Sequence, residues 1–309
     1  MATTHPVRFS IVCGQRAPWP ELAERAREVE SLGFHGFNVV DHFFGLKDVM
    51  DPTHEAYSIL AGLALVTTRV RLGVMVCGNT YRNPAFLLKQ AVTVDHMSNG
   101  RVDFGVGAGW LEREHEAYGF EFPSAKERVD RFAEALEIWK LLQSEERTTY
   151  LGEHYELIDA PFEPKPVQKK LPVLIGASAP RMLRLTARYA DIWNARGEPE
   201  IAKEQNEALT RACEEVGRDP NEIVRSISPS RNFLLSASDF QRNAEAYIAA
   251  GFTDFQLPWP RVPSEEPVLR QVAEEALHHI QPRRARRREV KVETGMPLEP
   301  TLDFLMFVS

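Results

Sequence analysis

The chain has 309 residues, of which 43% are hydrophobic and 26% are charged, so it is long enough to bury one large α/β core. Its formal net charge of −7 argues against nucleic acid as the main partner, because no overall positive field would attract phosphates. No apolar run approaches the roughly 18 residues that a membrane span needs. We therefore expect a small-molecule substrate and no membrane partner.

The cysteine pattern bears on the compartment. Cys13, Cys77 and Cys213 are odd in number and widely spaced, with no C-x-x-C pair. This pattern favours neither a disulfide framework nor a zinc knuckle. Because no basic-then-apolar leader precedes Val7, we expect a reducing, cytoplasmic location.

Strand-like and helix-like segments alternate along the chain. The pattern predicts strands at 7–12, 36–40, 70–76, 102–106, 172–176, 191–194, 223–235 and 252–257. It predicts helices at 20–32, 55–66, 84–97, around 129–139, and at 181–189, 200–216, 239–250 and 265–280, with a long polar loop before the fourth. Eight β–α repeats indicate α/β architecture with a single closed (β/α)₈ TIM barrel over residues 1–280.

Two segments lie outside this repeat. Residues 148–157 are typical of a surface hairpin insertion, and the proline-spaced PFEPKPVQKKLP after it predicts an extended connector. Five arginines occupy six positions from Arg283 to Arg288. Because blocks of like charge are usually solvated, residues 281–309 are predicted to be a flexible basic tail.

The fourth strand runs into a glycine-rich loop. Gly105, Gly107 and Gly109 are spaced G-x-G-x-G, and Trp110 stands where a dinucleotide fingerprint needs its third glycine. A doubly wound nucleotide fold is therefore not expected. The glycines have two interpretations: close packing at a strand end, or a backbone that must approach a flat ligand.

Asp41 and His42 directly follow the second strand, where a barrel holds its chemistry. An imidazole can donate or accept a proton near neutral pH, and an adjacent carboxylate can fix its tautomer. The alternative is a helix-capping aspartate beside a packed histidine. No second histidine follows at a ligand spacing, so we expect no metal.

The loop Gly176-Ala177-Ser178-Ala179-Pro180 follows the fifth strand. Proline takes the place of the last glycine of a nucleophile elbow, which argues against that motif. Small residues before a proline-started helix expose backbone N–H groups and a hydroxyl to an anion. The interpretations left open are a phosphate-binding loop and a plain tight turn.

Together these motifs resemble the bacterial luciferase-like monooxygenase superfamily, and in particular its coenzyme F420-dependent oxidoreductase branch, found largely in actinobacteria. The resemblance covers residues 7–257. It rests on the DH pair, LGVMVCGNTYRNPAFLLKQAVTVDHMSNGR, GVGAGWLEREHEAYG, the segment from DAPFEPKPVQKKLP to ARYADIWN, and CEEVGRDPNEI. It implies a barrel that holds a flavin or deazaflavin ring over the carboxyl ends of the strands.

The resemblance also implies roles for individual residues. His42 is expected to handle the proton that accompanies hydride transfer, and Trp110, grouped with it among the catalytic residues, is expected to wall the pocket. Sugar-phosphate dehydrogenases of this branch carry a glutamate acid where this chain has Trp110, which makes sugar-phosphate oxidation doubtful. The expected cofactor-binding residues are Asp41, Met75 and Val76 with a cis peptide between them, Gly78, Gly107, Gly109, His115, Tyr118, Gly176, Ala177 and Ser178.

The chemistry then depends on the cofactor, because no side chain accepts a hydride. The favoured function is F420-dependent hydride transfer to or from a small organic substrate, such as an enone, imine or alcohol. One alternative is a reduced-FMN-dependent two-component monooxygenase, similar to the alkanesulfonate enzymes, with a flavin reductase as partner. Another is a non-catalytic flavin-binding barrel. The resemblance further implies a homodimer.

Overall fold

The computed structural model describes residues 5–260 and 262–280. Its main sheet has the strand order β3-β2-β1-β11-β10-β9-β8-β5-β4, and pairing of β3 with β5 closes it into a parallel barrel. The strands are β1 Arg8–Val12, β2 Gly36–Val39, β3 Arg71–Val74, β4 Cys77–Gly78, β5 Val102–Gly107, β8 Val173–Gly176, β9 Ile192–Gly197, β10 Val224–Pro229 and β11 Asp254–Pro258. The short β4 continues the path of β3, so the predicted eight-stranded TIM barrel is confirmed.

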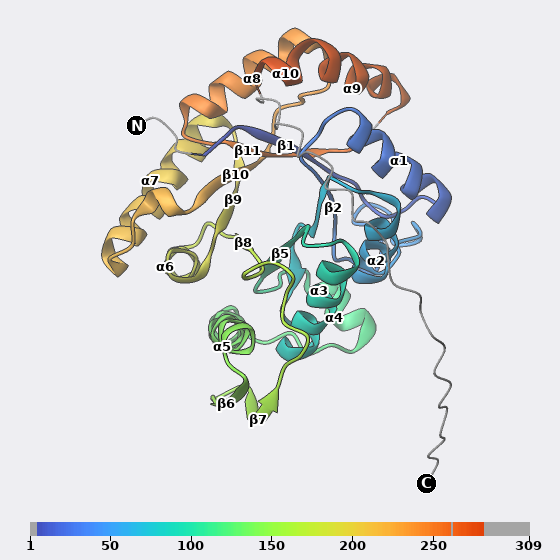
Figure 1. Ribbon diagram of the computed structural model, residues 1–309. Helices are drawn as coiled ribbons and strands as arrows, with labels where there is room; N and C mark the ends of the chain where they lie inside the picture. The colour runs from blue at the N-terminus through green and yellow to red at the C-terminus, as the bar shows by residue number, and fades with distance from the viewer. Residues whose placement is uncertain (1–4, 261, 281–309) are drawn as a thin grey trace, which may run out of the picture.

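Helices surround the strands (Figure 1). They are α1 Trp19–Ser31, α2 Ala56–Val66, α3 Pro84–Met97, α4 Glu112–Tyr118, α5 Ala125–Ser144, α6 Pro180–Tyr189, α7 Pro199–Val216, α8 Ala237–Ala249, α9 Glu266–Val272 and α10 His278–Ile280, with short 3₁₀ helices η1 Pro220–Glu222 and η2 Pro263–Glu265 and a π-helix η3 Ala273–Leu277. On α5, Phe132, Leu136 and Trp139 are buried, as their helical spacing predicts. Trp139 meets Phe104 of β5 edge-on, so the main core lies between helices and strands.

The amino-terminal ends of the strands are joined by largely buried charges. Arg8 of β1 pairs with Asp254 of β11 at 2.5 Å, and Arg71 of β3 pairs with Asp103 of β5 at 2.6 Å. Burial alone would raise the pKa of Asp103, but the nearby Arg71 outweighs it, and the pKa lies below the ordinary value. Asp103 therefore stays ionised, and these pairs fasten neighbouring strands at the end of the barrel away from the cavity described below.

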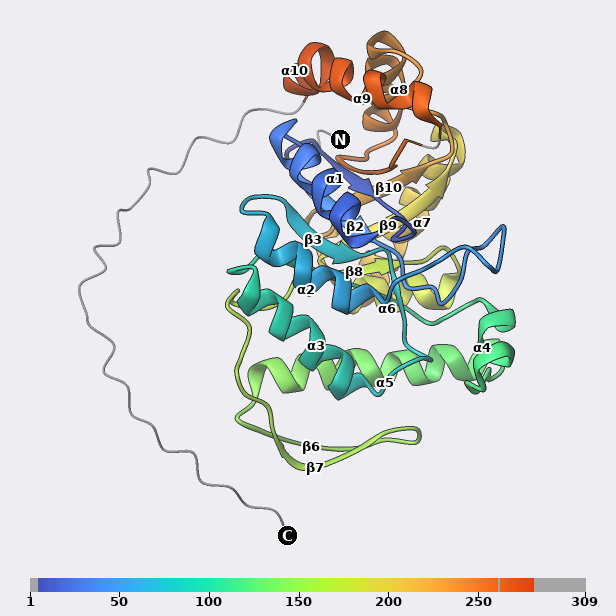
Figure 2. The ribbon, with the colours of Figure 1, turned by 90° about the vertical axis from the view of Figure 1, so that its right-hand side faces the viewer.

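The predicted hairpin is present and extends slightly further than expected. β6 Arg147–Leu151 pairs antiparallel with β7 Glu156–Pro161. Figure 2 shows the hairpin lying beside α5, outside the barrel. The Glu134 carboxylate of α5 accepts backbone N–H groups from Glu153, His154 and Tyr155, which fastens the hairpin turn to that helix.

Three predicted boundaries were wrong. The strand predicted at 70–76 is interrupted at Met75 and Val76, and the strand predicted at 223–235 ends at Pro229. The supposed polar loop after the glycines contains α4, which ends at Gly119 in a left-handed conformation. The tail predicted at 281–309 lies outside the described residues.

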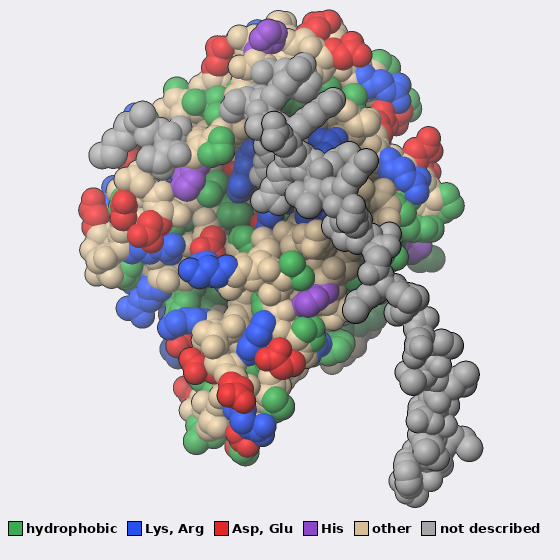
Figure 3. Space-filling model, viewed as in Figure 1, with side chains coloured by type: hydrophobic (Ala, Val, Ile, Leu, Met, Phe, Trp, Pro, Cys, Tyr) green, Lys and Arg blue, Asp and Glu red, His purple; other side chains and the backbone are tan. Residues whose placement is uncertain are grey.

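Three further observations concern the surface, the helices and the cysteines. Acidic and basic side chains are interspersed over the visible part of the face in Figure 3. Within residues 5–260 and 262–280, no helix combines the length and apolar character needed to cross a membrane. Cys13, Cys77 and Cys213 are buried free thiols.

Candidate active site

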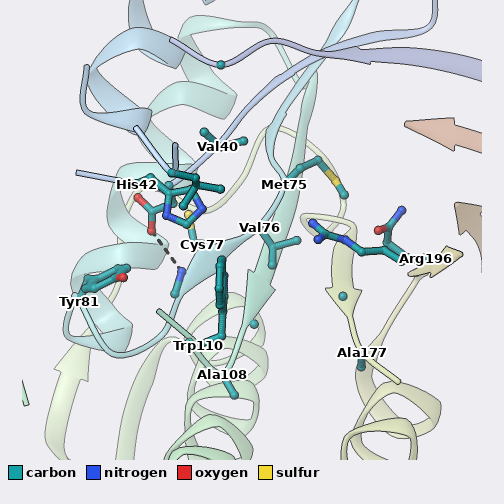
Figure 4. A pocket seen from close by; sticks show the side chains of 18 of the residues that line it. Val40, His42, Met75, Val76, Cys77, Tyr81, Ala108, Trp110, Ala177 and Arg196 are labelled. Carbon is teal, nitrogen blue, oxygen red and sulfur yellow. Dashed lines mark hydrogen bonds between the residues drawn. The ribbon is translucent and has the colours of Figure 1, made fainter. Parts of the chain in front are cut away.

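A cavity of about 710 Å³ opens at the carboxyl ends of the strands. In Figure 4, His42 and Trp110 lie on one side of it, Ala177 and Arg196 on the other, and Val76 between them. Eleven of the thirteen residues that the sequence assigned to the site line this cavity: Asp41, His42, Met75, Val76, Gly78, Gly107, Gly109, Trp110, Gly176, Ala177 and Ser178.

The cavity wall beside Val76 is nearly bare backbone. The Met75–Val76 peptide is cis, as the resemblance implies. A Cβ added to Gly107 would lie 3.0 Å from the Val76 side chain, and one added to Gly176 would lie 3.7 Å from it. Two glycines and a small apolar side chain thus leave room for a flat ring to approach closely.

Gly105, Gly107 and Gly109, in β5 and the loop after it, are needed as glycines for different reasons. A Cβ at Gly105 would stand 1.9 Å from the Val74 carbonyl oxygen, so that position is set by packing. Gly109 has φ +83° and faces Thr80, so it is set by conformation and packing together. Of the two sequence interpretations, strand-end packing therefore explains Gly105, whereas Gly107 borders the cavity.

His42 is held by a carboxylate distant in sequence. Its Nδ1 lies 3.0 Å from Oε2 of Glu114, at the start of α4. The imidazole also meets the Trp110 ring edge-on, with 5.9 Å between centroids. The prediction that the adjacent Asp41 would orient the histidine was wrong, because Asp41 has other partners.

Asp41 is instead paired with Arg82, which follows β4. Both carboxylate oxygens accept from the guanidinium at 2.8 Å, and Oδ2 also accepts the Gly78 N–H at 3.1 Å. Arg82 in turn contacts Glu55, the residue that caps α2. Asp41 thereby lies in the cavity wall as a neutralised charge that fixes the backbone near β4.

Glu114 is fully buried and ionised. Burial would raise its pKa, but hydrogen bonds from His42, Tyr81 and the Phe43 N–H outweigh burial and hold the pKa below the ordinary value. Burial and the Glu114 carboxylate raise the pKa of the Tyr81 hydroxyl, which donates at 2.8 Å. The site therefore contains a His–Glu pair supported by a tyrosine.

Two predicted cofactor residues do not line the cavity. His115 is fully buried, bonds to Thr80 and the Leu111 carbonyl, and stacks on Tyr81. Tyr118 packs against Phe43 at 4.8 Å between centroids. His115 thus packs α4 against the segment after β4, and Tyr118 packs α4 against the loop after β2, so neither lies in the cavity wall.

The opposite side of the cavity carries the small-residue loop. Ser178 is exposed and borders the cavity, and α6 begins at Pro180 without a side-chain cap. Its first-turn N–H groups therefore have no capping side chain, as an anion site requires. Arg196, at the end of β9, adds a positive charge to the same side.

Sequence reasoning missed Glu114, Tyr81, Arg82 and Arg196. Glu114 lies within the quoted motif GVGAGWLEREHEAYG, but Glu112 and Glu116 are equally spaced candidates there. Only the burial of one face of α4 distinguishes them: Glu114 is buried, whereas Glu112 and Glu116 are exposed. Arg82 follows β4 and Arg196 lies at the end of β9, and a position near a strand end was an available signal.

The model of the luciferase-like monooxygenase family matches residues 3–300, beyond the 7–257 on which the sequence resemblance rests. The chain belongs to this family. It is 32% identical over 217 residues to the F420-dependent glucose-6-phosphate dehydrogenase of Kineococcus radiotolerans, a match that covers 69% of this chain and 64% of that enzyme. It is 36% identical over 194 residues to the phthiodiolone/phenolphthiodiolone dimycocerosates ketoreductase of Mycobacterium tuberculosis, covering 59% and 50%.

The chain thus spans about half to two-thirds of the length of these curated relatives. Among solved structures, an F420-dependent secondary alcohol dehydrogenase in complex with an F420-acetone adduct superposes with a TM-score of 0.76 at 19% identity, covering 87% of this chain and 98% of that one. This likeness supports the same barrel fold.

Proposed function

We propose that this luciferase-like protein is an oxidoreductase that uses coenzyme F420 to transfer a hydride to or from a small organic substrate. The observation that carries the proposal is the placement of His42, held by Glu114, beside a cavity walled by Val76, Gly107 and Gly176. The curated relatives, which are named as an F420-dependent dehydrogenase and a ketoreductase, support the same chemistry.

The residues present fit a deazaflavin. The space left by the absent Cβ atoms of Gly107 and Gly176 suits a flat ring, and the uncapped start of α6 beside Ser178 suits a phosphate. When bound, the deazaflavin supplies or accepts the hydride. The phosphate assignment of Gly176, Ala177 and Ser178 stays a prediction.

The protein's own part is proton handling and exclusion of water. For an alcohol substrate, His42 accepts the hydroxyl proton through its ring; for a carbonyl substrate it returns that proton to the oxygen. Trp110, 63% exposed, and Leu46, 44% exposed, give the cavity an apolar mouth. An alcohol, ketone or enone with an apolar body suits this mouth better than a sugar phosphate.

The test is a titration of the protein with F420 and with FMN, read by fluorescence quenching. Ser178→Asp is expected to weaken F420 binding by about tenfold or more, because a carboxylate would repel the coenzyme phosphate. Ser238→Asp, an exposed serine in the first turn of α8, is the matched control. Preference for FMN would replace the proposal with a two-component monooxygenase, and binding of neither would remove it.

Three further expectations belong with this proposal. We propose that the protein is a homodimer, located in the cytoplasm, where buried free thiols such as Cys77 stay reduced. A flavin reductase is a partner under the FMN alternative alone. Size-exclusion chromatography with light scattering tests the dimer.

A further inference from the structure

The Glu114 carboxylate is buried at the contact between α4 and the loop after β2. It accepts hydrogen bonds from three groups: the Phe43 N–H at 2.7 Å, the Tyr81 hydroxyl at 2.8 Å and the His42 ring nitrogen Nδ1 at 3.0 Å. A buried carboxylate is costly unless its oxygens are hydrogen-bonded, so the site favours all three donors together.

These contacts determine which ring nitrogen of His42 carries hydrogen. An ionised carboxylate can only accept, so Nδ1 must be the donor. No described residue hydrogen-bonds Nε2, and the ring lies at the cavity wall (Figure 4). In the neutral imidazole, Nε2 is therefore the lone-pair nitrogen available to a substrate.

The residues around Glu114 are closely packed. Tyr81 stacks on His115 of α4 with 4.6 Å between centroids, and Phe43 packs against both Tyr81 and Tyr118. This aromatic cluster connects the loop after β2, the segment after β4 and α4. The carboxylate is thus fixed relative to His42 before any ligand enters, which lowers the cost of reorganisation.

We propose that Glu114 is a positioning residue, which holds His42 with hydrogen on Nδ1 and stabilises the imidazolium formed when Nε2 takes a proton. The inference rests on the proposed function. In alcohol oxidation, the O–H bond breaks and its proton moves to His42 Nε2. When bound, the coenzyme would accept the carbinol hydride with both electrons, so that the C–H bond breaks as the C=O bond forms. Reduction is the reverse.

The other charged groups around His42 do not replace Glu114. Asp41 is neutralised by Arg82, and Arg16 at the cavity is paired with Asp51. Burial raises the pKa of the Cys77 thiol, and the pKa of Tyr81 is also raised, so both stay neutral. Trp110 presents an uncharged edge. Removal of the Glu114 charge should therefore disfavour the imidazolium.

The test uses full-length protein labelled with ¹⁵N-histidine, with Glu114→Gln as the variant. Glu116→Gln is the matched control, because it makes the same charge change on an exposed residue of α4. His42 ring signals are assigned by their loss in His42→Asn. Wild type and Glu116→Gln should show the Nδ1–H tautomer without coenzyme, and Glu114→Gln should lose that preference.

Kinetics supply the second readout. Glu114→Gln should lower kcat for alcohol oxidation by about 10²-fold or more, as loss of a histidine-orienting carboxylate does in hydrolases. The midpoint of its rising pH–rate profile should move to lower pH, while the Kd for coenzyme stays unchanged. An Nε2–H tautomer in wild type, or a variant with unchanged tautomer and unchanged kcat, overturns the inference.

Two precautions keep the test decisive. Circular dichroism checks folding, and Tyr81→Phe, which keeps the carboxylate, should retain the Nδ1–H tautomer even if Glu114→Gln does not fold. Loss of that tautomer in a folded Tyr81→Phe protein would contradict Glu114 as its cause. The tautomer is measured without coenzyme, so absence of F420 binding would overturn the proposed function separately.

Discussion

Arg82 donates hydrogen bonds to both carboxylate oxygens of Asp41, with Nη1–Oδ2 and Nη2–Oδ1 distances of 2.8 Å. The side chains are 9% and 4% exposed, so the pair is largely shielded from water. Because Asp41 also accepts the Gly78 N–H, the pair ties the end of β2 to β4 across the cavity wall. Asp41 therefore fixes the backbone that forms the cavity wall, whereas Glu114 hydrogen-bonds and orients His42.

Replacement of Arg82 by alanine should be severely destabilising. It would leave the Asp41 charge buried and unpaired, which costs about 3–5 kcal/mol of unfolding free energy. Arg184→Ala, which removes an exposed pair with Glu215, should cost less than about 1 kcal/mol. Urea unfolding of both variants measures this, and equal losses would contradict a structural role for the Arg82–Asp41 pair.

Acid stability should depend on Asp103. Its pKa is lower in the folded protein than in the unfolded chain, so folding is favoured above the unfolded value of about 4 and this contribution is lost as the pH falls further. Asp103→Asn should be less stable than wild type at pH 7, with a difference that shrinks below about pH 4. Asp48→Asn, on an exposed loop, should follow wild type throughout. Thermal unfolding between pH 3 and pH 7 gives the comparison.

His42→Asn should affect turnover much more than binding. The amide cannot accept a proton, so kcat should fall by about 10²- to 10⁴-fold, while the F420 affinity changes little. Steady-state kinetics and fluorescence titration of the same preparation separate the two effects. A variant that retains wild-type kcat would show that His42 does not handle the proton.

Two glycine substitutions should separate folding from binding. Gly105→Ala would place a Cβ 1.9 Å from the Val74 carbonyl oxygen and should cost about 1–3 kcal/mol or more. Gly176→Ala meets Val76 at an ordinary 3.7 Å and should keep its stability within about 0.5 kcal/mol. Because that methyl group borders the cavity, it should still weaken coenzyme binding. A stable Gly105→Ala protein would refute the packing account.

The barrel was predictable because its signals are local. Apolar strands, amphipathic helices, the Gly33 C-cap and Pro84 at a helix start each follow from a few neighbouring residues. The position of His42 was predictable for the same reason, since the ends of barrel strands meet at one face. The glycines beside it were harder, because Gly105 and Gly107 serve different purposes that only their neighbours reveal.

The partners of His42 and Asp41 were not predictable, because they depend on side-chain directions across long sequence separations. Glu114 is 72 residues from His42, and Arg82 is 41 residues from Asp41. Because Asp41 and His42 are adjacent in sequence, we expected their side chains to pair. Instead, Asp41 binds Arg82 and His42 contacts Glu114. The resemblance assigned His115 and Tyr118 to the cofactor site, whereas on α4 both side chains belong to the aromatic cluster.

The Arg8–Asp254 and Arg71–Asp103 pairs sit at the end of the barrel opposite the cavity. This separation makes the protein a tractable scaffold for redesign. Exchange of cavity-rim residues such as Leu46 and Trp110 changes which molecules enter, while the ion pairs that join the strands stay untouched.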